Sequence, residues 1–131
     1  IGLFDPRYFL YFEGVDHCFA AKRAGWEVVF YPHTTVVHLG GESAKSSGEI
    51  TQTGRQLSAL QVESELLYFR KNHGLGGLIL DALLVLLADS LATIKRLLKP
   101  TTFAAFIAGW RHAKMFFTLL IKTKGGKRPT R

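Results

Sequence analysis

Hydrophobic and polar positions follow a helical period in the first part of the chain. Val15, Cys18 and Phe19 recur at the i, i+3, i+4 spacing of one buried helical face. Basic residues then precede Gly25, which is a common residue just beyond a helix end. The pattern predicts a helix over residues 15–24.

Short runs of β-branched and aromatic residues lie on both sides of this helix. Residues 8–12 are an aromatic cluster with the composition of a strand. Residues 27–31 and 34–39 are predicted strands, separated by Pro32. Residues 41–53 are rich in Gly, Ser and Thr, which predicts a loop.

A helical pattern continues through the second half of the chain. It predicts helices over residues 55–71, 78–98 and 103–122. Asn72-His73-Gly74 ends the first of them, and Pro100 separates the other two. We expect residues 125–131 to fray.

Positive charge is concentrated at the C-terminal end. The net charge is +7, and ten of the 17 lysines and arginines follow Asp89, after which no acidic residue occurs. Such a segment suits an anionic lipid surface, a nucleic acid or an acidic partner. The chain carries no zinc-finger spacing or RNA-recognition motif, so we expect no nucleic-acid partner. Its single cysteine, Cys18, excludes a disulfide within the chain.

The apolar run at residues 78–94 contains Asp81 and Asp89, which argues against a membrane span. Residues 103–121 combine aromatic and aliphatic positions with central cations, as an in-plane interfacial helix does. We therefore expect the basic tail, residues 74–131, to lie on an anionic membrane surface. The alternative is a helical hairpin packed on the rest of the chain or in a homo-oligomer.

Three blocks in the first third of the chain, in order, resemble a signature of inverting family 2 glycosyltransferases. FDPRYFLYFEGVDHC at residues 4–18 resembles FDE-FF-Y-EDVDLC. AGWEVVFYP at 24–32 resembles AGW-V-Y-P, and VVHLGGES at 36–43 resembles V-H-GG-S. The match covers residues 2–43, and members resembling rhamnosyltransferases of cell-surface polysaccharides are the most similar.

This resemblance implies an α/β fold. Residues 1–73 would be the C-terminal portion of a GT-A (Rossmann-like) catalytic domain, on its acceptor and base side, followed by amphipathic helices over 74–131. Because the chain opens at Ile1 as though inside a domain, we expect a fragment that is inactive alone. The donor-binding half, with an Asp-x-Asp motif that holds Mg²⁺ or Mn²⁺, would precede it.

The activity implied is transfer from a nucleotide-diphospho-sugar to a cell-surface polysaccharide or lipid-linked glycan. The protein would be cytoplasmic and peripheral at the inner face of the cell membrane. A second interpretation is a non-catalytic membrane-associating or assembly module that retains the fold.

An inverting transfer needs a carboxylate that takes the proton of the acceptor hydroxyl. The family uses the Asp of a Glu-Asp pair, and this chain has Gly14 at that position. Glu13 and Asp16 are the two candidate bases in the motif, and the alternative is a base supplied elsewhere or an inactive member. Asp16 could instead compensate the dipole of the predicted helix.

The resemblance assigns His38 to the metal or the diphosphate, and a structural hydrogen-bonding role is the alternative. Gly40 and Gly41 would let the backbone pass close to the bound nucleotide-sugar, or belong to an ordinary loop.

Overall fold

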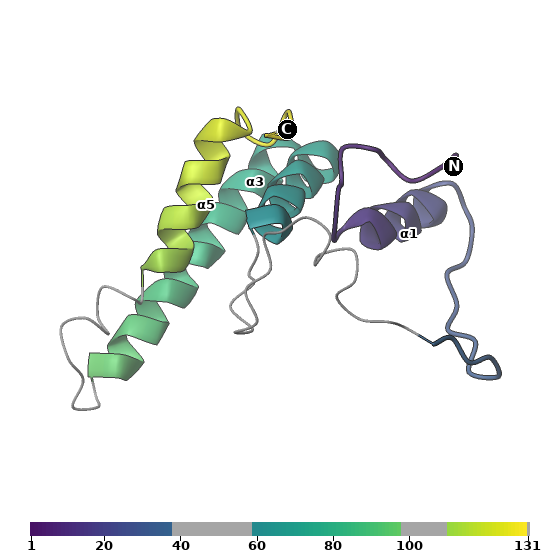
Figure 1. Cartoon of the computed structure of the whole chain (residues 1–131), viewed down its shortest axis with the longest axis horizontal. Coiled ribbons are helices and arrows are strands. Elements are labelled where there is room, and N and C mark those ends of the chain that lie inside the picture. The colour runs from purple at the N-terminus through teal and green to yellow at the C-terminus, as the bar shows by residue number, and fades with distance from the viewer. Residues whose placement is uncertain (38–58, 98–109, 131) are drawn as a thin grey trace.

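The computed structural model describes residues 1–37, 59–97 and 110–130. Within these ranges the chain forms α1 (Glu13–Arg23), α3 (Ala59–Leu97) and α5 (Arg111–Lys122). Figure 1 shows α5 running beside the second part of α3, while α1 lies at the other end of the molecule. The architecture of the described residues is therefore a helical hairpin with an additional short helix.

The described residues contain no strand, so the prediction of an α/β, GT-A-type fold is wrong for them. Residues 9–12 form bends, and residues 24–37 have no regular structure beyond isolated turns. Phe30 is 90% exposed in this segment. A strand is stable only when a neighbouring strand satisfies its backbone groups, and the described residues supply none. The last two residues of the predicted 34–39 strand lie outside the described residues.

The predicted helix at residues 15–24 is confirmed as α1, which begins two residues earlier. Two backbone hydrogen bonds of a Schellman motif end this helix. The Gly25 N–H donates to the Lys22 carbonyl at 3.1 Å, and the Trp26 N–H donates to the Ala21 carbonyl at 3.0 Å. Gly25 has φ +85°, the left-handed conformation that this termination requires.

Gly74 divides α3 into two helical segments. Its backbone has φ 67° and ψ −155°, which breaks the helical hydrogen-bond pattern. The predicted end of a helix at this glycine is thus confirmed, although the second segment follows directly instead of starting at residue 78. A side chain at Gly77 would place its Cβ 2.2 Å from the His73 Cβ, so the first turn beyond the bend requires glycine.

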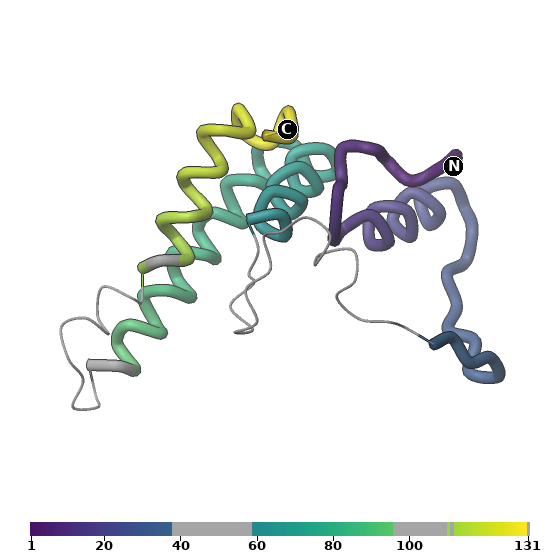
Figure 2. Tube along the Cα trace, in the orientation of Figure 1, coloured from purple at the N-terminus to yellow at the C-terminus, as the bar shows by residue number. Residues whose placement is uncertain are grey.

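One hydrophobic core joins both segments of α3 to α5. It contains Val62, Leu66, Leu78, Val85, Ala113, Phe116 and Leu119. Figure 2 shows the traces of α3 and α5 side by side. The buried apolar residues of α5 therefore pack on α3. The core also crosses the predicted boundary between residues 73 and 74, while that division into domains stays a prediction.

Asp89 of α3 caps the N-terminus of α5. Trp110 precedes α5 and makes no side-chain cap. The Asp89 Oδ2 instead accepts the Ala113 backbone N–H at 2.8 Å, and its Oδ1 lies 3.6 Å from the His112 Nδ1. A carboxylate here satisfies an otherwise unpaired N–H and interacts favourably with the helix dipole. This acidic residue thus fixes how the two helices dock.

The segment after α5 returns to the first part of α3. Gly126 has φ +70°, and a Cβ there would lie 2.3 Å from the Leu66 carbonyl oxygen, so only glycine fits. The Thr130 N–H donates to Glu63 Oε1 at 3.2 Å, and its hydroxyl donates to Glu63 Oε2. The expectation that this end frays is wrong for residues 125–130, because these contacts hold it against the core.

Candidate functional site

A cluster of polar side chains joins α1 to α3; we call it the α1–α3 polar cluster. Its members are Asp5, Tyr8, Asp16, Lys71 and Asn72. Asp16, only 5% exposed, is at its centre. Its Oδ1 accepts from the Tyr8 hydroxyl at 3.2 Å and the Asn72 amide at 2.7 Å, and its Oδ2 accepts from Lys71 Nζ at 2.6 Å. These donors hold α1 against the end of the first segment of α3.

Asp5 extends the α1–α3 polar cluster toward the surface. The Arg7 guanidinium approaches its Oδ2 at 2.6 Å, and Lys71 Nζ donates to the same oxygen at 2.8 Å. The Arg7 side-chain hydrogen bonds, reinforced by Lys71, hold the pKa of Asp5 well below its usual range despite partial burial. Burial opposes the charge of Lys71, but its hydrogen bonds to Asp16 and Asp5 raise its pKa overall. The ammonium therefore stays charged.

Tyr8 completes the contact as a neutral donor. Burial, followed by the adjacent negative charge of Asp16, raises the pKa of the Tyr8 hydroxyl well above 10. Its ring packs with Leu67 and Tyr68 in a second, smaller core. We conclude that Tyr8 and Asp16 have a structural role, fastening the turn before α1 to α3.

Glu13 lies in the first turn of α1 and is half-buried. Its Oε2 is inaccessible to solvent and has no hydrogen-bond partner among the described residues. The two predicted bases therefore differ in their surroundings. Asp16 accepts three hydrogen bonds, whereas one carboxylate oxygen of Glu13 accepts none from the described residues.

Gly14 stands where the glycosyltransferase signature that residues 4–18 resemble has an aspartate. A Cβ built on this glycine meets no atom of the described residues within 4 Å, so a side chain fits among them. His38, Gly40 and Gly41, predicted to contact the metal or the nucleotide-sugar, lie outside the described residues. Residues 1–37, 59–97 and 110–130 contain no group of three or more His, Cys, Asp or Glu side chains that could hold a metal ion.

A carboxyl pair that the sequence reasoning missed joins the two segments of α3. Glu65 hydrogen-bonds with Asp81 across the bend. Burial, followed by the charge of Asp81, raises the pKa of Glu65 to about 7. Burial also raises the pKa of Asp81, and the hydrogen bond from Glu65 acts in the opposite direction. The pair therefore holds a proton near neutral pH. The sequence offered one indication of this pair, because Glu65 and Asp81 each lie within an apolar helical pattern.

We expect the stability of the hairpin to fall as the pH rises from about 4.5 to about 7. Folded Glu65 keeps its proton to higher pH than the unfolded chain does, so the free energy of unfolding decreases through this interval. The loss is about 1–2 kcal/mol after allowance for the solvent-exposed part of the side chain. Urea unfolding at several pH values measures it. Glu65→Gln should flatten the dependence and Glu27→Gln, at an exposed position, should not; an unchanged slope in Glu65→Gln contradicts the assignment.

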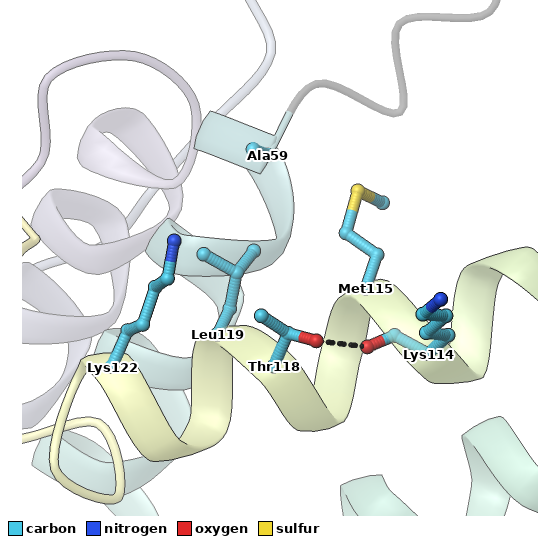
Figure 3. Close-up of a pocket in the computed structure, with 6 residues that line it drawn as sticks. All are labelled: Ala59, Lys114, Met115, Thr118, Leu119 and Lys122. Atoms are coloured by element: carbon cyan, nitrogen blue, oxygen red, sulfur yellow. Dashed lines mark hydrogen bonds between the residues drawn. The ribbon is translucent and has the colours of Figure 1, made fainter.

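An open pocket of about 340 Å³ lies between α5 and the start of α3. Figure 3 shows the residues that line it, which are Ala59, Lys114, Met115, Thr118, Leu119 and Lys122. The Thr118 hydroxyl donates to the Lys114 carbonyl at 2.7 Å, so its donor is used within α5. The rest of the lining is apolar apart from two lysines. Such a pocket suits a ligand that carries an anionic group on an apolar body.

The second segment of α3 exposes a continuous apolar surface, which we call the leucine stripe. Its members are Ile79, Leu80, Leu83, Leu84, Leu87, Leu91 and Ile94, and each is 54–58% exposed. Ala88 is the one other exposed residue between residues 79 and 94. By length and composition alone, one helix among the described residues, residues 59–95, could cross a membrane. Soluble monomers rarely leave so large an apolar surface uncovered.

Comparisons of the chain with protein-family models, with curated proteins and with solved structures find no match.

Proposed function

We propose that the chain is the acceptor-side part of an inverting glycosyltransferase that uses a nucleotide-diphospho-sugar. The three blocks in residues 4–43 carry this proposal, and Glu13 adds support because its Oε2 has no hydrogen-bond partner among the residues that the structure describes. The acceptor would be a cell-surface polysaccharide or a lipid-linked glycan.

In this proposal Glu13 is the general base. It removes the proton of the acceptor hydroxyl while the acceptor oxygen forms its bond to the anomeric carbon and the bond to the nucleoside diphosphate breaks. The proton ends on the Glu13 carboxylate. A divalent cation would act as a Lewis acid toward the departing diphosphate. Asp16 is a weaker candidate because Tyr8, Lys71 and Asn72 occupy its oxygens.

We expect Glu13→Gln in the full-length protein to lower kcat for sugar transfer at least about a hundredfold, because an amide cannot accept the proton. Initial rates with a radiolabelled nucleotide-sugar measure the effect, and circular dichroism checks the helical content. Glu27→Gln is the matched control, because Glu27 is exposed outside α1. Unchanged transfer by Glu13→Gln would reject Glu13 as the base.

The open space at Gly14 makes this experiment sharper. Gly14→Asp, introduced into the Glu13→Gln variant, places a carboxylate where the family carries its base. Recovery of transfer in the double variant would support a glycosyltransferase site at the start of α1. A double variant as inactive as Glu13→Gln would argue against it.

A second candidate function is a non-catalytic membrane-associating module, peripheral at the inner face of the cell membrane. The leucine stripe is the observation that favours it. The two candidates are separable, because vesicle binding without any effect of Glu13→Gln on transfer would favour the second alone.

A further inference from the structure

We infer that the second segment of α3 lies in the plane of an anionic lipid surface, with the leucine stripe facing the acyl chains and Asp81 and Asp89 facing α5. The inference rests on the membrane-associating role proposed above. The contact face and the orientation of the helix go beyond that role.

The exposed and buried residues of this segment occupy opposite sides of the helix. At 100° per residue, the stripe residues from Ile79 to Ile94 fall on one half of the helical circumference. The buried residues Leu78, Val85 and Thr93 fall on the other half, which packs on α5. The stripe is about 22 Å long, given the rise of 1.5 Å per residue.

The two carboxylates that interrupt the apolar run do not face the stripe. Asp81 is 5% exposed and Asp89 is 7% exposed. Asp81 pairs with Glu65, and Asp89 caps α5. The charges that argue against lipid contact in the linear sequence are therefore turned inward in the fold.

The docking of α5 distinguishes an in-plane helix from a spanning one. α5 packs along α3 and carries exposed lysines, including Lys114 and Lys122. A spanning α3 would bring these ammonium groups into the hydrocarbon, which is costly. An in-plane α3 leaves them at the level of the headgroups or in water.

Charge complementarity selects an anionic lipid surface as the occupant. The exposed cations from residue 95 onward include Lys95, Lys114, Lys122, Lys124, Lys127 and Arg128. No acidic residue follows Asp89 to offset them. Anionic headgroups attract such a module, whereas a second copy brings the same positive charges and repels it.

Depth measurements at two stripe positions test the orientation. In a Cys18→Ser background, Leu80→Cys and Leu91→Cys of the full chain are each labelled with an environment-sensitive fluorophore. Vesicles of phosphatidylglycerol and phosphatidylcholine are then compared with phosphatidylcholine alone. We expect both labels to shift to shorter wavelength on the anionic vesicles and to be quenched equally by lipids brominated at one depth. A label at Val29→Cys, also exposed, should not shift.

Each of the other outcomes rejects either the in-plane orientation or the membrane role. Depths that differ by roughly 16 Å, the rise over eleven residues, would mean a spanning helix and reject the in-plane orientation while the membrane role stands. Shifts that follow protein concentration without vesicles would mean that a second copy covers the stripe. That result, or no shift under any condition, would reject the membrane role as well.

A substitution pair provides an independent measurement. Leu84→Gln with Leu87→Gln should weaken binding to the anionic vesicles at least roughly tenfold, because apolar contact with the bilayer is lost. Val36→Gln with Val37→Gln, at two exposed valines outside the helices, is the matched control and should bind normally. Circular dichroism checks that both pairs fold. Equal binding by the two variants would show that the stripe does not contact lipid.

Discussion

Phe116→Ala is expected to lower the free energy of unfolding by about 3–5 kcal/mol, because it removes a large fully buried side chain and leaves a cavity. Phe116 is 0% exposed and packs in the core that joins both segments of α3 to α5. A domain of this size has a total stability of only roughly 5–15 kcal/mol. The variant should therefore unfold at much lower urea concentration, as followed by circular dichroism.

Phe117→Ala is the matched control for this substitution. Phe117 is the neighbouring residue of the same helix and is only partly buried against the same core. The same change in composition and helix propensity should cost clearly less there. Equal losses at the two positions would contradict the packing of α5 on α3.

Asp16→Ala is expected to lower the free energy of unfolding by about 3 kcal/mol. The substitution removes the acceptor of the Tyr8, Lys71 and Asn72 hydrogen bonds. Removing one partner of a buried ion pair leaves the other charge uncompensated. Asp5 still lies 2.8 Å from Lys71 Nζ, which limits the loss to the lower end of the usual range. Urea unfolding followed by tyrosine fluorescence reports on the contact between α1 and α3.

Glu27→Ala gives the comparison for the lost negative charge, because Glu27 is exposed. We expect a change within about 0.5 kcal/mol for that variant. If Asp16→Ala were equally mild, the α1–α3 polar cluster would not hold the two helices together. Asp16 would then return as a candidate base beside Glu13.

The helices were predictable where the sequence pattern is local. The spacing of Val15, Cys18 and Phe19 predicted the helix α1, and Gly25 predicted its end. The predicted buried face is wrong, because Val15 and Cys18 are exposed and α1 buries Asp16 and Ala21 instead. Gly74 likewise marked the break in α3. The strands predicted at residues 27–31 and 34–39 are absent from the described residues for the opposite reason. β-branched composition expresses a preference that only a neighbouring strand can satisfy, and no such neighbour occurs among the described residues.

The sequence indicated which residues belong to the candidate site but not how they are arranged in space. The motif indicated both Glu13 and Asp16. Glu13 adjoins the position of the signature's aspartate, but the sequence does not show what surrounds either carboxylate. The hydrogen bonds that distinguish Asp16 from Glu13 come from Lys71 and Asn72, which are 55 and 56 positions from Asp16. The pairing of Glu65 with Asp81 depends in the same way on the bend at Gly74. Such contacts arise only after the helices have packed.

The cap that Asp89 places on α5 bears on the order in which the helices form. α5 has 12 residues and lacks a side-chain cap of its own, and isolated helices of about that length are marginal in water. Its first stable turn therefore depends on the carboxylate of a helix that precedes it in the chain. During synthesis residues 110–122 would stay coil-like until α3 has formed, so the hairpin closes in a single late step with α5 folding onto a template.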